Sequence, residues 1–339
     1  MEKYTPTWPV IGHATVVAAL RRHVMKGSIG HAYLLHGPRQ IGKTTVAEQF
    51  AAALLCSVQE RAIACDECQS CRQRAAGVHP DFHILLPTVN SETTFGRPII
   101  TLEQVRQLQA ALSHRPVLAR RQVAIIVGGD SLQDKAANAL LKTLEEPSGN
   151  TVLVLTCDAL EQLPLTVRSR CRQLRLSTVA TAAIFDALRA GGSSPSVARQ
   201  IAALSAGRPG RALQFLHSSD QREAYVAGLK DFGRLASGTL SERLAAANAL
   251  QQRLSAADDA SLAEGLRQQL ELWQTAARDR LLNAAGCPHL CQWTVEDTAG
   301  SSPAQWRFFL DTLRDVRAAL GLNASPRLAL EVLLLSLPR

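Results

Sequence analysis

The segment Gly37-Pro-Arg-Gln-Ile-Gly42-Lys43-Thr44 has the residue types and spacing of a phosphate-binding loop. Glycine at both ends of the spacer lets the backbone curl, so that successive N–H groups face the phosphates of a nucleotide. In this pattern the lysine reaches the terminal phosphates and the threonine hydroxyl holds Mg²⁺. The candidate nucleotide-binding residues are therefore Gly37, Gly42, Lys43, Thr44 and the adjacent Thr45.

Four cysteines behind this loop predict a second kind of chemistry, metal binding. Cys56, Cys65, Cys68 and Cys71 have the spacing C-x8-C-x2-C-x2-C, and four thiolates complete the tetrahedral coordination of Zn²⁺. Because cysteines in a cytosolic chain are kept reduced, a cluster of them indicates metal rather than disulfides. We expect a zinc knuckle at residues 56–71, a closed structural site with no open position for catalysis.

Other potential metal ligands have simpler interpretations. His79 and His83 are spare candidates, but four sulfurs already close the site. The remaining cysteines are scattered along the chain, and we interpret them as packing residues: Cys157, Cys171, Cys287 and Cys291.

ATP hydrolysis needs more than a phosphate loop. One acidic residue must hold the magnesium and another must activate water, usually at the end of a neighbouring strand. The candidate strand, Val123–Val127, runs into Gly128-Gly129-Asp130, so Val127 and Gly128 occupy the two positions where acids are needed. Asp130 comes too late and is typical of a helix start. The sequence therefore predicts an ATPase centre that lacks its catalytic acids.

The elements that position these residues alternate between apolar runs and helical patterns. The expected strands are Ala32–His36, Phe82–Leu86, Val123–Val127 and Val152–Leu155, and the expected helices between them are Lys43–Leu55, Thr101–Ser113 and Asp134–Glu145. This order predicts an α/β domain, a parallel sheet with helices on both faces.

The character of the chain changes after Arg175, where helical patterns dominate. Turns at Gly191–Pro195 and Gly207–Gly210 interrupt them. The last two helices have clear starts, because Ser302-Pro303 and Ser325-Pro326 each place a capping hydroxyl before proline. The final helix, at residues 327–337, is nearly all apolar, and we expect it to be buried in a bundle or an interface.

Composition sets wider limits on function. The chain of 339 residues is long enough for two or three domains, and its 46% hydrophobic and 19% charged residues are typical of a globular protein. A net charge of +8 permits contact with nucleic acid without requiring it. No apolar run approaches the roughly 20 residues of a membrane helix, and the first residues contain no apolar signal core. We expect a cytoplasmic protein.

Two further segments bring a family resemblance. Asn138-Ala-Leu-Leu-Lys-Thr-Leu-Glu-Glu-Pro147 alone is an amphipathic helix ended by proline, and Ser169-Arg170-Cys171 alone is a basic stretch. Joined to the phosphate loop and the four-cysteine insert, they closely resemble the AAA+ clamp-loader subunits of bacterial DNA polymerase III. The opening Trp8–Gly12 is also similar to that family, and the match is strong over roughly residues 5–176.

The resemblance implies an AAA+ nucleotide-binding domain at residues 1–177, a small helical lid at 178–216 and an all-α collar domain for oligomerisation at 217–339. The family contains a hydrolysing motor subunit, gamma/tau, and a non-hydrolysing stator, delta-prime. Motor subunits carry a lid arginine in a Gly-x-x-Arg turn, whereas this turn is Gly207-Arg-Pro-Gly210, with Arg208 and Arg211 shifted from the pattern. With the missing acids, this makes the chain more similar to the stator.

By this resemblance the chain joins gamma/tau and delta in a hetero-pentamer that opens the sliding clamp on primed DNA. Arg170 is then an arginine finger acting in trans on ATP held by gamma/tau, and Arg168 is the second choice. No polymerase activity and no ATPase activity of its own are expected. The intact phosphate loop departs from the degenerate loop common in stators, so ATP or ADP with Mg²⁺ remains a candidate structural ligand.

Two alternatives remain open from the sequence. One is an active ATPase of the same family, which would use Glu145, Glu146 or Asp130 as its acids. The other is a zinc-dependent nucleic-acid binder with a vestigial nucleotide site, favoured by the net charge of +8.

Overall fold

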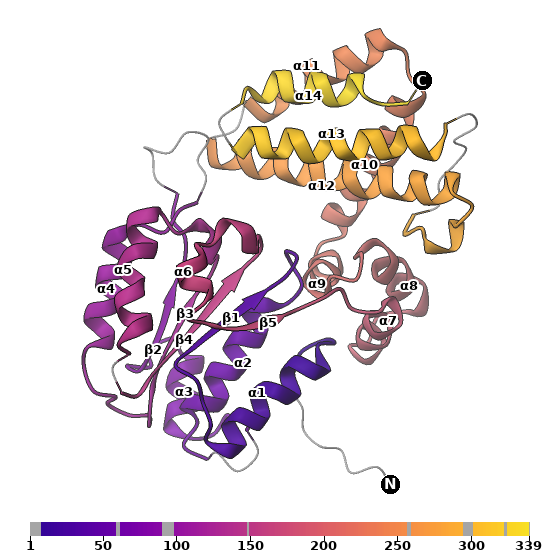
Figure 1. Cartoon of the computed structure of the whole chain (residues 1–339). Coiled ribbons are helices and arrows are strands. Elements are labelled where there is room, and N and C mark those ends of the chain that lie inside the picture. The colour runs from indigo at the N-terminus through magenta and orange to yellow at the C-terminus, as the bar shows by residue number, and fades with distance from the viewer. Residues whose placement is uncertain are drawn as a thin grey trace. The chain divides into compact units, whose positions relative to one another are not determined.

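The structure is a computed structural model that describes residues 8–58, 62–89, 98–147, 149–255, 259–293, 301–321 and 324–338. Its contacts group into two compact units (Figure 1). The N-terminal unit comprises the chain to residue 88 and residues 98–213, and the chain from Gln214 onward belongs to the C-terminal unit. Among the described helices, none combines the length and apolarity needed to cross a membrane.

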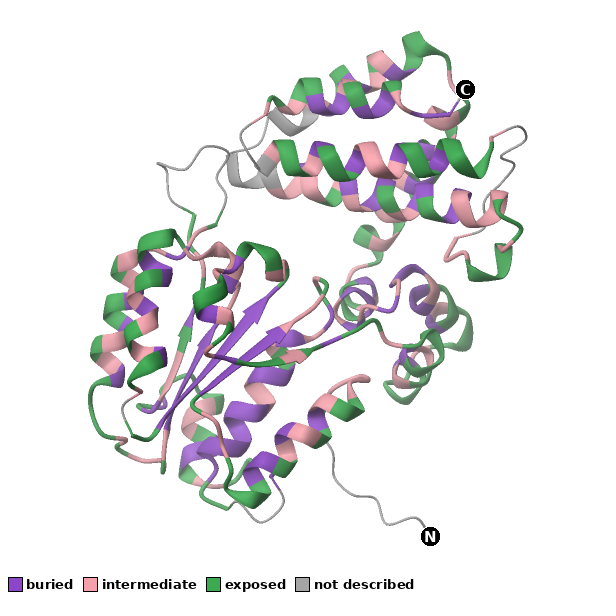
Figure 2. Ribbon diagram, in the orientation of Figure 1, coloured by how far each residue is buried: buried purple, intermediate pink, exposed green. Residues whose placement is uncertain are grey.

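A five-stranded parallel sheet organises the N-terminal unit, in the order β2-β3-β4-β1-β5 (Figure 1). The strands are β1 Ala32–His36, β2 Phe82–Leu85, β3 Gln122–Ile126, β4 Thr151–Cys157 and β5 Arg172–Arg175. The central strands β3 and β4 are buried along their whole length, as Figure 2 shows in purple. The prediction of a parallel sheet is confirmed, although β5 was not expected. It is a short edge strand whose exposed arginines resemble a solvated basic stretch.

Side chains from the sheet alternate between two apolar cores, one on each face. One core holds every second residue of the three central strands together with α1 and α2, and the other core holds the alternate residues together with α4 and α5. The first set is Tyr33, Leu35, Val123, Ile125, Val152 and Val154, and the second is Ala32, Leu34, Ala124, Ile126, Leu153 and Leu155. Burial on both faces explains the continuous apolar runs of the sequence.

The helices of this part are α1 Ala14–Lys26, α2 Lys43–Leu55, α3 Gln69–Ala75, α4 Leu102–Leu112, α5 Asp134–Glu145 and α6 Leu165–Arg168, with short 3₁₀ turns η2 Gly129–Ser131 and η3 Leu160–Gln162. Helix α2 begins at the lysine of the phosphate loop and ends one residue before Cys56. Helix α4 starts with a capping box in which the side chains of Thr101 and Gln104 satisfy each other's backbone N–H groups.

Three short helices follow β5: α7 Thr181–Ala190, α8 Pro195–Leu204 and α9 Pro209–His217. We refer to them as the lid helices. The expected turn at Gly207–Gly210 is shorter than predicted, because α9 already begins at Pro209. Proline at this first helical position costs no hydrogen bond, since its missing N–H has no helical partner there.

The C-terminal unit is all helical, with α10 Ser219–Ser237, α11 Leu240–Ser255, α12 Asp259–Ala284, η4 Pro288–Leu290, α13 Pro303–Gly321 and α14 Pro326–Leu335. Aromatic rings of Phe232, Trp273, Trp306 and Phe309 pack at its centre. The buried Arg280 guanidinium lies 5.1 Å from the Phe232 ring centroid, where the ring faces stabilise its charge.

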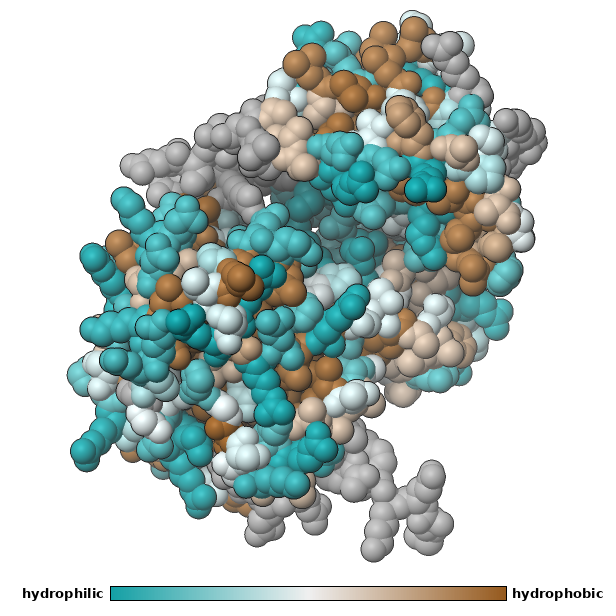
Figure 3. Space-filling view, in the orientation of Figure 1, coloured by the Kyte–Doolittle hydropathy of each residue, from teal (hydrophilic) through white to brown (hydrophobic). Residues whose placement is uncertain are grey.

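The last helix is partly buried within this chain, and its start differs from the expected cap. Helix α14 is only half buried in this chain, because Leu328, Val332 and Leu335 are exposed on it while Leu333 and three other residues are buried. Apolar side chains are visible at the surface of this unit in Figure 3. The hydroxyl of Ser325 makes no capping hydrogen bond, whereas that of Ser302 accepts the Gln305 N–H.

Asp81, the residue before β2, binds a loop that is distant in the sequence. Its side chain is fully buried and accepts three backbone N–H groups, from Val117, Leu118 and Ala119, each at 2.7 Å. Burial opposes ionisation of this carboxyl, but the three hydrogen bonds outweigh it and lower the pKa of Asp81 below its ordinary value. The ionised side chain therefore contributes to stability.

We expect Asp81→Asn to destabilise the protein by about 3 kcal/mol at pH 7, because the amide cannot accept all three bonds. The folded pKa is lowered, so this stability is fully present above the unfolded pKa of about 4 and is lost as the pH falls through the folded value. Urea denaturation of both proteins at pH 7, 5, 4 and 3 is the measurement. Asp186→Asn, at an exposed position, is the control. A difference that is unchanged at pH 3 would contradict this account.

Candidate functional site

The phosphate loop has the curled backbone that anion binding requires. Gln40 and Gly42 have φ values of 58° and 99°, and such left-handed positions turn successive N–H groups toward one point. Gly37 has a φ of 153°, and a Cβ there would lie 2.1 Å from the carbonyl oxygen of Leu176. A side chain at residue 37 is therefore impossible without moving the backbone. The expected loop residues Gly37, Gly42 and Lys43 lie together in one curved loop.

The loop lysine is bound by the chain itself. Lys43 is only 7% exposed, and its ammonium donates to the carbonyl oxygens of Gly37 at 2.8 Å and Pro38 at 2.7 Å. It also forms an ion pair with Asp158 at 2.6 Å. The other oxygen of this carboxylate lies 3.3 Å from Nε of Arg39. Asp158, immediately after β4, was not identified from the sequence, although a polar residue following a buried strand was a usable signal.

The end of β3 offers no carboxylate where a motor ATPase needs one. Val127 and Gly128 follow the strand, and the Gly128 N–H donates to Oγ1 of Thr156 at 3.1 Å. Asp130 lies in η2, and its carboxylate accepts the backbone N–H of Asp158 at 3.2 Å. Burial, reinforced by the negative charge of Asp130, raises the pKa of Cys157 to about 12, so this thiol stays neutral. Asp130 is therefore bonded to the backbone beyond β4 and does not stand at the end of β3.

The first turn of α9 is hydrogen bonded to the phosphate loop. The N–H of Gly210 donates to the carbonyl oxygen of Gln40 at 2.7 Å. Nε of Arg211 donates to the side-chain oxygen of Gln40 at 3.2 Å. A Cβ on residue 210 would lie 2.7 Å from the same Gln40 carbonyl oxygen. The position that holds a lid arginine in the motor pattern therefore has no room for any side chain.

The candidate arginine finger contacts Glu145, Thr166 and Ser169, the last through a long hydrogen bond of 3.5 Å to the hydroxyl oxygen. Nη2 of Arg170 lies 2.6 Å from the carboxylate of Glu145 at the end of α5, and Nη1 donates to the carbonyl oxygen of Thr166 at 2.9 Å. The side chain is still 36% exposed. Arg168 is half-buried instead, and its Nε lacks a hydrogen-bond partner within the described chain. Both arginines are partly exposed, and the guanidinium of Arg170 has both hydrogen-bond and ion-pair partners.

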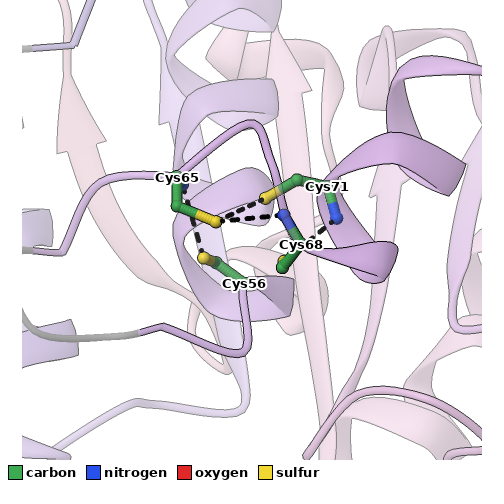
Figure 4. A group of neighbouring side chains, drawn as sticks. All are labelled: Cys56, Cys65, Cys68 and Cys71. Carbon is green, nitrogen blue, oxygen red and sulfur yellow. Dashed lines mark hydrogen bonds between the residues drawn. The ribbon is translucent and has the colours of Figure 1, made fainter.

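The four predicted cysteines come together (Figure 4), with their sulfur atoms all within 4.8 Å of one another. Cys56 follows α2, Cys65 and Cys68 lie in the next loop, and Cys71 lies on α3. Backbone N–H groups of Cys65, Cys68 and Cys71 each donate to a sulfur of the cluster at 3.4 Å. Hydrogen bonds of this kind stabilise thiolates, so the cluster can hold one metal ion.

The thiols of the cluster differ in how readily they ionise. Burial raises the pKa of Cys56 and of Cys71, so these thiols resist ionisation on their own. Burial has the same tendency at Cys68, but hydrogen bonds involving Ser57 and Cys71 outweigh it and lower its pKa to about 6. Four ionised sulfurs this close would repel one another without a metal.

His79, one of the two spare histidines, is hydrogen bonded to groups outside the cysteine cluster. His79 pairs with Ser70 at 2.8 Å through Nε2 and accepts the Asp81 N–H at 3.0 Å through Nδ1. The Ser70 hydroxyl donates in turn to the carbonyl oxygen of Leu55 at 2.7 Å, which ties α3 to the end of α2. In the part of the chain that the structure describes, the metal-competent group contains these four cysteines and no histidine.

A phosphate loop on a five-stranded parallel sheet, followed by lid helices and a further helical unit, defines the protein as one of the AAA+ class. The family model described as "DNA polymerase III, delta subunit" matches residues 12–180, and this half of the chain belongs to that family. The chain is 40% identical over 205 residues to DNA polymerase III subunit delta' of Pseudomonas aeruginosa, a match that covers 59% of this chain and 60% of the relative.

Two other relatives are more distant. The delta' subunit of Bacillus subtilis is 32% identical over 187 residues, covering 55% of this chain and 54% of the relative. The gamma subunit of Buchnera aphidicola (Schizaphis graminum) is 31% identical over 180 residues, covering 53% and 47%. The chain thus matches about half to three fifths of the length of these curated relatives.

The close approach of α9 to the phosphate loop leads to a prediction about Gly210. We expect Gly210→Ala to destabilise the N-terminal unit by about 1–2 kcal/mol, because the backbone contact with Gln40 must open. This loss outweighs the gain of about 1 kcal/mol that alanine has over glycine in a helix. Thermal unfolding is the measurement, with Gly149→Ala as control, since nothing lies within 4 Å of a Cβ there. A stabilised Gly210→Ala protein would refute the close contact.

The cysteine cluster leads to a second prediction. We expect about one metal ion per purified chain, and Cys68→Ser should lose most of it and unfold at a lower temperature, because a serine oxygen is a poor replacement for a thiolate. Elemental analysis by mass spectrometry gives the metal content. Cys287→Ser is the matched control, since that thiol lies outside the cluster. Equal metal content in Cys68→Ser and the unmodified protein would exclude the cluster as the metal site.

Proposed function

We propose that the protein is a non-hydrolysing, delta-prime-like subunit of a clamp loader that places a sliding clamp on primed DNA during replication. The observation that carries this proposal is the arrangement around Lys43, which is ion-paired to Asp158 while Val127 and Gly128 stand where catalytic acids are needed. Such a centre has a nucleotide-binding shape without the groups that activate water. The delta' relatives support the same assignment.

In this role the protein contributes Arg170 to ATP bound by a neighbouring gamma/tau subunit. Its guanidinium retains N–H donors beyond those used by Glu145, Thr166 and Ser169, since an arginine has five. A group held in advance at one orientation loses little entropy when it meets the transition state. Arg168 remains the second choice.

The proposed partners are gamma/tau and delta in a hetero-pentamer, with the clamp and primed DNA reached through the assembled complex. The half-exposed helix α14 supports a role for the C-terminal unit in assembly, because Leu328, Val332 and Leu335 recur at helical spacing on one exposed stripe. ATP or ADP with Mg²⁺ is a structural ligand of Lys43 and Thr44 in this proposal, and no membrane is involved.

Zinc is the proposed metal of the cysteine cluster. Sulfur ligands at about 2.3 Å from a tetrahedral zinc ion lie about 3.8 Å apart, close to the 4.0 Å between Cys65 and Cys71. With four thiolates the site is closed, so zinc would contribute folding energy rather than catalysis.

The two alternatives receive less support. An active ATPase would use Glu145, Glu146 or Asp130 as its acids. Glu145 is paired with Arg170, and Glu146 lies at the C-terminal end of α5. Asp130 accepts the N–H of Asp158. The nucleic-acid-binder reading rests on net charge alone.

The test is reconstitution of gamma/tau, delta, clamp and primed DNA with this chain as unmodified protein or as Arg170→Ala. We expect clamp-dependent ATP turnover and clamp loading to fall by about tenfold or more, because a donor to the transition-state charge is removed. Assembly of the complex, measured by gel filtration, should be unchanged.

Arg172→Ala is the control, since Arg172 is an exposed arginine two residues further along. Arg168→Ala distinguishes the second choice from the first. Unchanged turnover in a correctly assembled Arg170→Ala complex would reject the finger, and turnover by the isolated chain above that of Lys43→Ala would reject the non-hydrolysing role.

A further inference from the structure

The carboxylate of Asp158 contacts both cationic side chains of the phosphate loop, Lys43 and Arg39. Its oxygens are 2.6 Å from the ammonium of Lys43 and 3.3 Å from Nε of Arg39. Both cations belong to the loop that would hold a nucleotide. Neither the phosphate-loop pattern nor the family resemblance assigned a role to this residue.

The ammonium of Lys43 has no donor to spare. It carries three N–H bonds, and three acceptors surround it, namely the carbonyl oxygens of Gly37 and Pro38 and the carboxylate of Asp158. A phosphate oxygen must therefore displace one of them. The carboxylate is the acceptor that a phosphate most resembles, since both are anionic oxygens that favour charge-assisted bonds.

The position of Asp158 is imposed by the sheet rather than by its own side chain. Strands β1 and β4 are parallel neighbours whose last residues, His36 and Cys157, are paired. The next residues along each strand, Gly37 and Asp158, therefore leave the sheet side by side. The Asp158 N–H also donates to the carboxylate of Asp130 at 3.2 Å, which fixes the backbone at this point.

A phosphate that entered with Asp158 still in place would meet a like charge. In a site with Mg²⁺-holding acids such a charge is neutralised by the metal, but Val127 and Gly128 supply no such acids at the end of β3. The charge of Asp158 therefore opposes nucleotide binding, whereas the curled backbone of the loop favours it.

We infer that Asp158 is an internal substitute for phosphate that occupies the loop cations and sets a low affinity for nucleoside triphosphates and diphosphates. This inference rests on the part of the proposed function in which the loop still takes nucleotide, and it is independent of Arg170. The loop is then a closed site, which opens when the pair between Lys43 and Asp158 breaks.

The test is the affinity of the full chain for ATP and ADP, each with and without Mg²⁺, by isothermal titration calorimetry. We expect Asp158→Asn to bind both nucleotides about tenfold more tightly or better, since the competing charge is gone and the lysine remains. Glu161→Gln is the control, because it removes one exposed negative charge nearby without touching Lys43. Circular dichroism establishes that each variant is folded, and Asp158→Ser serves as a second variant.

Each other outcome is informative. Equal affinity of Asp158→Asn and the unmodified protein overturns the inference and leaves nucleotide binding intact. Weaker binding by the variant, seen only with Mg²⁺, also overturns it, because Asp158 would then be a metal ligand. Binding by neither protein overturns both the inference and nucleotide retention, while the reconstitution with Arg170→Ala still tests the clamp-loader role separately.

Discussion

The N-terminal unit depends on the pairing of β1 with β4 at the centre of the sheet. Parallel neighbours end at the same edge, so the loop after His36 and the chain after Cys157 leave the sheet together. The Gly37 N–H donates to the carbonyl oxygen of Cys157, which continues the ladder by one bond. The distance between the loop and Asp158 is thus set by two buried backbones. The sheet therefore fixes the backbones from which the Lys43 and Asp158 side chains meet.

Much of this unit was predictable from the sequence, because buried elements leave local signals. The strand Ala32–His36 and the helices Lys43–Leu55 and Asp134–Glu145 have the predicted bounds. Their apolar runs lie beside glycine or proline, which restrict where an element can begin or end. Strand β5 was missed for the opposite reason, since an edge strand needs little apolar character and tolerates exposed arginines.

The candidate site was predictable only where its chemistry is local. The four cysteines lie within one short segment, so their spacing alone indicates that they can surround one ion. The ion pairs of Asp158 with Lys43 and of Glu145 with Arg170 join residues on different elements. No spacing rule relates such partners, because the sheet topology and helix packing bring them together. The same holds for the contact between Gly210 and Gln40.

The intact phosphate loop is compatible with the proposed stator role, because its shape has structural reasons besides nucleotide binding. Gly37 packs against the carbonyl oxygen of Leu176 and tolerates no side chain. The left-handed Gln40 turns its carbonyl oxygen toward Gly210 of α9, which fastens the lid helices to the loop. Replacing either residue would disturb packing even in a protein that never hydrolyses ATP. The absence of acids near β3 carries no such penalty, because the N–H groups of Val127 and Gly128 are bonded to the Leu85 carbonyl oxygen and the Thr156 hydroxyl oxygen. The packing of Gly37 and the hydrogen bond between Gln40 and Gly210 therefore favour retention of the phosphate loop even in a protein without the catalytic acids.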